Sequence, residues 1–345
     1  MSGGAQADRA LNKVDISVII PIYNAETYLP TCLDSVIEQS LPAGKKIEIL
    51  AVNDGSTDGS ADILANYQRK YACLQVIEQP NQGQSVARNK GIQAAVGDYL
   101  MFADSDDYLA PDTFVKCLKM ATETRADILY FDCQHTDKQG VRGEVFSNYQ
   151  PGILAGEVFR PVDHPQVLRA LPSPCSKFYK RSFIQEKGLF FKPGIWFEDL
   201  HFYLQLILQN PRMVYLPLPL YLYRQHGTSI TKSFADERNR AIITVFEDIL
   251  ALYQQHKDYE HYRAELDFLG LEHIYTGILY IASKGRNKDL YRDVKRYYKA
   301  NFPLVDGAEH RLNRYRLPRN KRLIATLADL HLLWLAGVPA SHRKL

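Results

Sequence analysis

The sequence predicts an α/β protein with a mostly parallel sheet flanked by helices, followed by a C-terminal helical region. Through the first 130 residues, short apolar runs alternate with amphipathic stretches, as in strands joined by helices. After Ser233 the strand pattern stops and helical spacing continues. With 345 residues, 46% of them apolar and 23% charged, the chain is long enough for about two folded domains and is not a disordered protein.

The predicted sheet opens with one strand and one helix. Asp15–Ile22 is a β-branched run typical of a strand buried on both faces. Apolar residues then recur at helical spacing from Leu29 to Ile37. Thr27 is a candidate N-cap of this helix, and Pro30 falls in its first turn, where proline is tolerated.

Four further strands are predicted at 47–52, 74–78, 99–103 and 127–132. A helix from about Ser85 to Ala95 precedes the strand at 99–103. Ligands of such sheets bind beyond the carboxyl ends of the strands, so the functional site is expected there.

The rest of the chain is less regular. Residues 134–174 are rich in Gly, Pro and polar residues and predict a loop-rich insertion. A helix is predicted to begin near Glu198, and the prolines of Val214–Tyr223 favour an edge strand or extended crossing over a central strand. Helices are predicted at 238–256, 263–283 and 288–299. The predicted organisation is a flexible N-terminus (1–14), an α/β domain (15–233) and a helical region with a basic amphipathic end (234–345).

The sequence predicts a cytoplasmic protein. Five widely spaced cysteines without a CxxC pair argue against a zinc site or a disulfide framework and indicate a reducing compartment. The first 15 residues lack the apolar core of a signal peptide, and no run approaches 18 apolar residues.

Polar, turn-forming segments follow three of the predicted strands, at Pro21–Asn24, Asn53–Ser60 and Asp104–Asp107. Because the carboxyl ends of parallel strands meet at one edge, these segments are expected to form a binding site. Asp54 stands at the strand edge, in a segment that also has the composition of an ordinary capped strand-to-helix loop.

Asp104 and Asp106 are a candidate metal site. Two carboxylates at this spacing can reach one hard cation, and oxygen ligands favour Mg²⁺ or Mn²⁺, which substrate phosphates typically share. A solvated turn is the alternative, and the position after a strand favours the metal. Nearby Asp107 has the pattern of a surface or capping group.

Arg88 falls one turn inside the helix predicted after Gly83. An arginine there can meet a phosphate or a nucleotide base with forked hydrogen bonds. A solvated helix arginine is the alternative.

Four segments stand in the order found in glycosyltransferase family 2, and over roughly residues 15–225 the chain resembles that family. They are SVIIPIYNAETYLPTCLDSV, VNDGSTDGS, NQGQSVARNKGIQAAVGDYLMFADSDDYL and WFEDLHFYLQL. The family comprises inverting enzymes with a GT-A fold, a Rossmann-like α/β sheet. The resemblance implies that 15–233 is the catalytic domain.

The resemblance also implies roles for single residues in binding the nucleotide. Residues matching Pro21 and Tyr23 line the base and ribose site, and the one matching Asp54 contacts the base. The residue matching Arg88 lies near base and phosphate. The pair matching Asp104 and Asp106 holds the ribose and the metal-bound diphosphate.

The implied catalytic base is Asp199, with Glu198 as its neighbour. Adjacent carboxylates raise one another's pKa, which suits a base, although two acids at a helix N-terminus also stabilise the helix dipole. In Tyr223–Thr231, Arg224 or His226 is implied to stabilise the leaving diphosphate. Lys177 matches a recurring lysine to which no role is assigned.

These expectations describe a hexosyl- or N-acetylhexosaminyl-transferase. It would move a sugar from a nucleotide-sugar, with UDP as the expected nucleotide, to a hydroxyl of a glycan or lipid-linked glycan, and form a β-linkage in cell-surface polysaccharide synthesis. One alternative is a non-catalytic nucleotide-sugar-binding scaffold of a glycan assembly complex, against which the intact carboxylates argue. The other is a nucleotidyltransferase, which should carry a Gly-rich basic loop after the first strand.

The charge pattern suggests a role for the tail. The formal net charge of +3 combines +10 over residues 284–345 with −7 over the first 283 residues. Six basic residues between Arg311 and Arg322 precede an amphipathic stretch with a tryptophan, Leu323–Leu335. Such a pattern suits an anionic membrane surface at the inner face of the cell membrane, with packing on the body or self-association as the alternatives. No nucleic-acid recognition motif accompanies the charge.

Overall fold

The computed structural model describes residues 13–225, 237–302, 313–330 and 333. The chain divides into two compact units. The first contains the residues up to 194 together with 198–227, and the second contains 195–197 and the residues from 228 onward. A three-residue segment in the middle of the chain therefore groups with the C-terminal unit.

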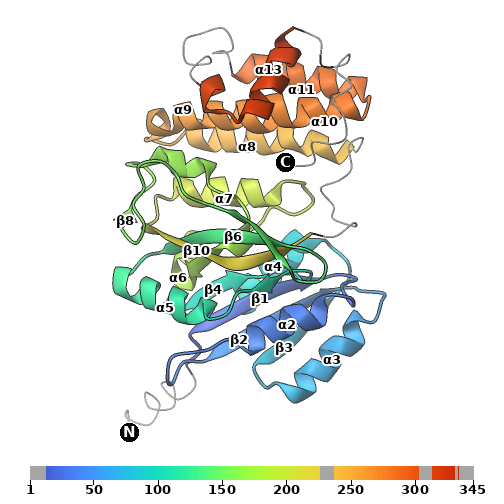
Figure 1. The fold of residues 1–345 in the computed structure, drawn as a ribbon, viewed down its shortest axis with the longest axis vertical. Helices are drawn as coiled ribbons and strands as arrows, with labels where there is room; N and C mark the ends of the chain where they lie inside the picture. Colours follow the sequence, from blue (N-terminus) through green and yellow to red (C-terminus); the bar gives the residue numbers. More distant parts are fainter. Residues whose placement is uncertain (1–12, 226–236, 303–312, 331–332, 334–345) are drawn as a thin grey trace. The chain divides into compact units, whose positions relative to one another are not determined.

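One ten-stranded sheet forms the first unit (Figure 1). Its strand order is β3-β2-β1-β4-β9-β6-β10-β5, with β7 beside β6 and β8 beside β10. The strands are β1 (Ile16–Ile22), β2 (Ile47–Asp54), β3 (Leu74–Gln79), β4 (Tyr99–Phe102), β5 (Tyr108–Leu109), β6 (Ile128–Thr136), β7 (Arg142–Phe146), β8 (Val158–Phe159), β9 (Lys177–Lys180) and β10 (Met213–Arg224). The predicted α/β fold class is confirmed.

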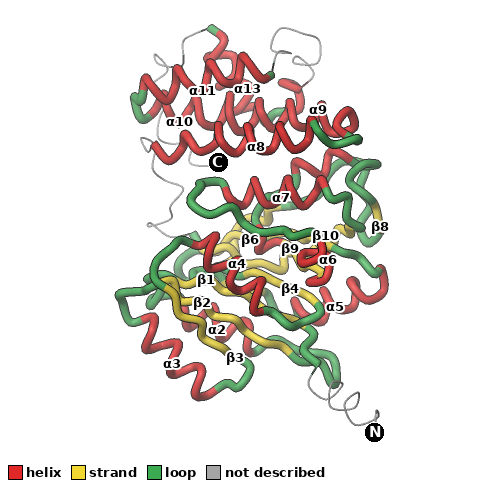
Figure 2. The backbone as a smooth tube through the Cα atoms, turned by 180° about the vertical axis from the view of Figure 1, so that it is seen from behind, coloured by secondary structure: helices red, strands yellow, loops and turns green. Residues whose placement is uncertain are grey.

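Helices cover both faces of this sheet (Figure 2). The helices are α2 (Leu29–Ile37), α3 (Ser60–Lys70), α4 (Gln84–Ala94), α5 (Thr113–Thr124), α6 (Arg181–Glu186) and α7 (Glu198–Leu208), with short 3₁₀ helices η1 (Pro165–Arg169) and η2 (Pro174–Ser176). The strands β3, β2, β1 and β4 are parallel, so α2 and α3 lie on one face and the reversing connection through α4 on the other. All seven residues of β1 are buried, as its β-branched run predicts.

The predicted starts of two helices agree with the structure to within one residue, but the predicted N-cap of the first helix is wrong. Helix α2 begins after Tyr28, and no side chain caps it, so Thr27 is not its N-cap. Helix α4 begins at Gln84, which puts Ser85 inside the helix. Gly83 precedes it with φ of +88°, a conformation that glycine adopts without strain.

Strand β9 was missed, and it changes the character of the sheet. It lies between β4 and β6 and is antiparallel to both, so the sheet is parallel at its β3-β2-β1-β4 side and mixed beyond β4. The segment Lys177–Lys180 is too short to show an alternating pattern. Residues 134–174 also contain more strand than expected, because β6 extends to Thr136 and pairs with β7 in a hairpin.

Strand β10 lies inside the sheet, which contradicts the edge position predicted from its prolines. β5 pairs with Tyr221 and Leu222, and β8 pairs with Met213 and Val214. The middle of the strand is therefore bonded on its β6 side, with irregular register around Pro219. Proline is accommodated there because no second neighbour needs its missing N–H.

The second unit is helical, as predicted. Its helices are η4 (Glu237–Arg240), α8 (Ala241–Gln254), α9 (Tyr259–Leu269), the π-helix η5 (Gly270–Ile278), α10 (Leu279–Lys284), α11 (Lys288–Asn301) and α13 (Arg319–Asp329). Buried tyrosines fill its core: Tyr253, Tyr262, Tyr275 and Tyr298. Among the described residues, no helix is long and apolar enough to cross a bilayer.

Ion pairs attach α13 and the segment just before it to other helices of this unit. Arg316 meets both carboxylate oxygens of Glu265 at 2.5 and 2.6 Å, and Lys321 meets Glu272 at 3.0 Å. Arg314 meets Asp329 at 2.6 Å within the same segment. Three of the six basic residues predicted to face an anionic surface are therefore paired within the unit.

Candidate active site

The loops after β1 and β2 are joined by side-chain hydrogen bonds. The backbone N–H of Thr57 donates to Asn24 Oδ1 at 2.8 Å, and that of Ala25 donates to Ser60 Oγ at 2.9 Å. The backbone N–H of Gly59 donates to Glu26 Oε2 at 2.7 Å. The hydroxyls and amides of the DGSTDGS segment therefore fix the loops beside the site.

Pro21, Tyr23 and Asp54 lie together at the carboxyl ends of neighbouring strands. The register pairs Ile22 with Asn53, so Tyr23 and Asp54 follow side by side. Pro21 is buried in β1 beyond the last residue paired with β4. Tyr23 is 51% exposed, which suits a side chain that contacts a ligand.

Asp54 organises the approach to helix α4. Its carboxylate accepts hydrogen bonds from Gln79 Nε2 at 2.7 Å and from the backbone N–H groups of Gln82 and Gly83, each at 2.8 Å. The side chain is 3% exposed. The aspartate therefore links the end of β2 to the start of α4, the helix that carries Arg88.

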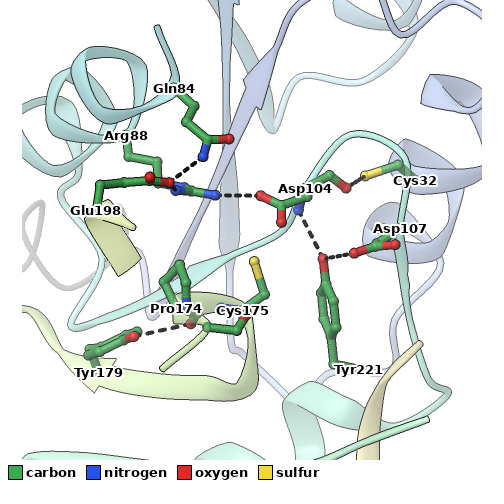
Figure 3. Close-up of polar contacts among 11 residues, drawn as sticks. Cys32, Gln84, Arg88, Asp104, Asp107, Pro174, Cys175, Tyr179, Glu198 and Tyr221 are labelled. Carbon is green, nitrogen blue, oxygen red and sulfur yellow. Dashed lines mark hydrogen bonds and ion pairs between the residues drawn. The ribbon is translucent and has the colours of Figure 1, made fainter. Parts of the chain in front are cut away.

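Arg88 lies between two carboxylates (Figure 3). Its NH2 group is 2.8 Å from Asp104 Oδ1 and its NH1 group is 3.1 Å from Glu198 Oε1. Burial acts to lower the pKa of the guanidinium, but the charges of the carboxylates outweigh it, and the pKa is raised. The Phe191 ring lies 5.2 Å from the guanidinium carbon. A buried, permanently charged arginine thus replaces the solvated helix arginine of the alternative interpretation.

Asp104 and Asp106 are partly exposed in the turn after β4, whereas Asp107 is buried. Burial and the two neighbouring aspartates raise the pKa of Asp107 well above its usual range. Its interpretation as a surface or capping group is wrong, because its carboxylate accepts bonds from the Tyr221 hydroxyl and the Arg224 backbone N–H, each at 2.8 Å.

Glu198 and Asp199 open helix α7 but differ in their partners. Glu198 accepts from Arg88 and from Gln84, one helical turn before Arg88 on α4. Asp199 accepts the backbone N–H of Leu200 at 2.7 Å. Burial, and then the charge of Glu198, raises the pKa of Asp199 to about 6. Phe197 directly before the pair has φ of +64°, a strained conformation for a residue with a side chain.

Lys177 is buried near this end of α7. Its Nζ donates to the backbone carbonyls of Leu171 at 2.6 Å and Ser173 at 2.8 Å, and lies 4.5 Å from the centre of the Tyr203 ring. Burial lowers the pKa of this lysine to about 7. The lysine fixes the segment that leads into β9.

Arg224 takes a position that the sequence did not indicate. It is 7% exposed, its Nε donates to the backbone carbonyl of Asp106 at 3.1 Å and its NH1 to that of Lys138 at 3.2 Å. His226 lies outside the described residues. The structure therefore brings Arg88, Asp104, Glu198 and the α7 start together and places Asp54 at the base of the same helix α4.

Three partners of this cluster were not predicted: Gln84, Asp107 and Tyr221. Gln84 stands four residues before Arg88, a spacing that puts both on one helix face and was a usable signal. Asp107 and Tyr221 are 114 residues apart. Nothing in a single sequence connects them.

The donors at the turn suit a hard divalent cation. Asp104 and Asp106 offer carboxylate oxygens at a strand end, where a ligand can supply further oxygens. Among the described residues, no group of three His, Cys, Asp or Glu side chains could hold a metal by itself.

Glycosyl transferase family 2 matches residues 17–187. The protein EpsH of Bacillus subtilis is 32% identical over 263 residues, which are 73% of each chain. The chain belongs to glycosyl transferase family 2. As a family 2 glycosyltransferase it is an enzyme, and the non-catalytic scaffold is not supported.

Another relative of this family 2 enzyme is the poly(ribitol-phosphate) beta-glucosyltransferase of Bacillus spizizenii. It is 33% identical over 182 residues, which are 52% of this chain but 27% of that protein.

Solved structures share the GT-A fold of this family 2 enzyme. S. aureus TarS 1-349 in complex with UDP-GlcNAc superposes with a TM-score of 0.71 at 20% identity and 92% coverage of both chains. The mannosyltransferase PcManGT of Pyrobaculum calidifontis, in complex with GDP-Man and Mn²⁺, gives a TM-score of 0.54 at 17% identity, covering 96% of this chain and 94% of that one.

Proposed function

We propose that this family 2 enzyme transfers a sugar from a UDP-linked donor to a hydroxyl of a glycan or lipid-linked glycan and forms a β-linkage in a cell-surface polymer. The observation that carries the proposal is the arrangement around Arg88, which connects the Asp104 turn to the carboxylates of α7. Arg88 thereby connects the turn proposed to face the phosphates with the start of α7, where the proposed base Asp199 lies. The names of the TarS complex and of the poly(ribitol-phosphate) enzyme support a UDP donor and a polymer acceptor.

In the proposed reaction, Asp199 is the general base. Its carboxylate takes the proton of the acceptor hydroxyl while the hydroxyl oxygen attacks the anomeric carbon. The bond from that carbon to the β-phosphate oxygen breaks, and its electron pair leaves with UDP. One displacement inverts the anomer, so an α-linked donor gives a β-linked product.

The other residues bind and orient the donor. Tyr23, Pro21 and Asp54 are proposed to receive the base and ribose, and Arg88 to lie near the phosphates. Asp104 and Asp106 are proposed to hold Mn²⁺ or Mg²⁺, which would neutralise charge on the diphosphate as it departs. Glu198 is paired with Arg88 and is proposed to keep it in place. Asp199 is therefore the carboxylate proposed to act as the base.

A donor panel tests this function. Thermal unfolding is measured with UDP, GDP and CDP, each with and without Mn²⁺, followed by release of UDP from UDP-sugars. We expect UDP with Mn²⁺ to raise the unfolding temperature most, since a ligand at a hundred times its Kd stabilises by about 2.7 kcal/mol. The proposal is refuted if UDP with Mn²⁺ does not raise the unfolding temperature, no UDP is released from any UDP-sugar, and Asp104→Ala changes neither result.

We also propose that the outer face of α13 contacts an anionic membrane surface. Arg319, Leu323 and Leu330 share this face, and the two leucines are 57% and 59% exposed. Exposed apolar residues beside a basic residue suit the headgroup region. Co-sedimentation with phosphatidylglycerol vesicles should be lost in Leu323→Glu and kept in Thr326→Ser. Equal sedimentation of wild type and Leu323→Glu would count against the surface.

A further inference from the structure

The turn that carries Asp104 and Asp106 is held from strand β10. Two residues near the end of that strand, Tyr221 and Arg224, contact the turn at several points. All of these contacts are between residues of the protein, so they set the geometry of the turn itself.

Asp107 is the buried anchor of this arrangement. Its side chain is 1% exposed, and one carboxylate oxygen accepts from the Tyr221 hydroxyl while the other accepts from the backbone N–H of Arg224. Its own N–H donates to the carbonyl of Asp104 at 3.0 Å, which closes the turn. Such a buried carboxylate is costly unless each contact is kept.

Tyr221 connects the anchor to the first aspartate of the pair. Its hydroxyl accepts the backbone N–H of Asp104 at 3.1 Å while it donates to Asp107 (Figure 3). The thiol of Cys32 also lies 3.5 Å from the carbonyl of Asp104. The backbone of Asp104 is therefore fixed on both sides, which leaves its carboxylate position to the Arg88 pair.

Arg224 holds the second aspartate of the pair, Asp106, by the backbone carbonyl of that aspartate. The guanidinium carbon lies 4.9 Å from the centre of the Tyr28 ring and 5.0 Å from that of Tyr108. From this position Nε donates to the carbonyl of Asp106. A planar guanidinium suits both tasks, because it contacts the two rings while it donates in its plane.

We propose that Tyr221 and Arg224 are positioning residues that hold Asp104 and Asp106 in the geometry that receives the metal-bound diphosphate. The inference rests on the proposed donor site, and it gives Arg224 a role different from direct contact with the leaving group. Two adjacent carboxylates repel each other, so a turn that presents both needs fixed backbone geometry to bind without reorganisation.

The hydroxyl of Tyr221 is tested with a matched control on the same strand. Tyr215 also donates its hydroxyl to an aspartate, Asp132, at 2.8 Å, but near the start of β10. Tyr221→Phe and Tyr215→Phe each remove one such bond. Calorimetry with UDP and Mn²⁺ should give a Kd raised roughly three- to tenfold for Tyr221→Phe and unchanged for Tyr215→Phe.

The role of Arg224 is tested by two substitutions. Lysine keeps the positive charge but has no planar fork, whereas glutamine loses the charge. A positioning role predicts that Arg224→Lys and Arg224→Gln weaken UDP–Mn²⁺ binding to a similar degree. Near-wild-type binding by Arg224→Lys with a large loss in Arg224→Gln would show a charge contact with the diphosphate and overturn the positioning role.

The outcomes separate this inference from the donor proposal. If wild type binds UDP–Mn²⁺ and Tyr221→Phe binds it equally well, the positioning role fails and the donor site stands. The same conclusion follows if Tyr215→Phe weakens binding as much as Tyr221→Phe, since the effect is then general destabilisation. If wild type binds no UDP, both proposals fall, because the turn has no such ligand to receive.

Discussion

Asp199 and Glu198 are adjacent in the chain but have different electrostatic surroundings. Glu198 is paired with Arg88, whereas burial and the charge of Glu198 raise the pKa of Asp199 to about 6. A carboxyl with that pKa is deprotonated at neutral pH and still basic enough to accept a proton. The two neighbouring acids therefore have different roles: Glu198 pairs with Arg88, and Asp199 is suited to accept a proton.

Replacing Asp199 should abolish transfer without affecting donor binding. We expect Asp199→Asn to lower kcat by about 10² to 10⁴, the usual contribution of a general base, with the Kd for UDP unchanged. Glu198→Gln is the matched control, which should weaken donor binding more than it lowers kcat because Arg88 loses a partner. Wild-type turnover by Asp199→Asn would exclude it as the base.

Activity should follow the protonation of Asp199. Because its pKa is raised to about 6, the basic form is lost as the pH falls through 6. The value of kcat/KM at low donor should then decline about tenfold per pH unit below that point. A rate that stays constant from pH 7 to pH 5 would contradict this assignment.

The same pKa makes Asp199 a cost to folding at neutral pH. The carboxyl has its ordinary pKa of about 3.9 in the unfolded chain, so the unfolded state loses its proton first and stability falls as the pH rises from 4 to 6. Asp199→Asn should therefore raise the free energy of unfolding by about 1 to 3 kcal/mol at pH 7.5. Urea denaturation should show no such gain at pH 4.

At the scale of elements, helix α4 depends on close contact with β1. A Cβ built on Gly91 would lie 2.3 Å from Ile19 Cγ2, so the helix approaches the strand at a residue without a side chain. Gly91 stands one turn after Arg88 on the same helix.

Gly91→Ala should displace α4 and cost about 1 to 3 kcal/mol of stability. The displacement would also move Arg88 away from Asp104, so UDP binding should weaken. Gln93→Ala, at an exposed position of α4, is the control and should change neither quantity. Thermal unfolding and calorimetry report the two effects, and an unaffected Gly91→Ala variant would show that the helix can shift without consequence.

The strands β1, β2 and β4 could be predicted because each is a run of mostly buried residues, and the ends that carry Pro21, Asp54 and Asp104 followed from them. β9 and the inner position of β10 could not. Four residues carry too little pattern for β9. The prolines of β10 are tolerated because its neighbours on the side away from β6, β5 and β8, have only two residues each. Contacts such as Tyr221 to Asp107 depend on tertiary structure that local propensity does not encode.

At the scale of the molecule, the charged tail acquires a structural role. The sequence predicted a basic end. Within the second unit, Arg316 attaches the segment just before α13 to α9, and Lys321 attaches α13 to η5. The order of the basic residues in the chain could not predict which of them would form ion pairs within the unit.

Glu265→Gln should destabilise the helical unit. The carboxylate is buried and meets Arg316 through both oxygens, so its loss should cost about 1 to 3 kcal/mol. Glu260→Gln is the control, because its pair with Arg263 is on the surface and should contribute less than about 1 kcal/mol. Equal unfolding temperatures for the two variants would show that the Arg316 pair does not stabilise the helical unit.

The segment 195–197 limits how such enzymes can be recombined. It groups with the second unit, where Trp196 lies 4.3 Å from the guanidinium of Arg238, and it ends one residue before Glu198. A chimera joined at a single crossover near residue 228 would combine Trp196 of one parent with the helices of the other. Exchange of C-terminal regions between relatives therefore requires three crossovers, two of which flank residues 195–197, with one of those two directly before Glu198.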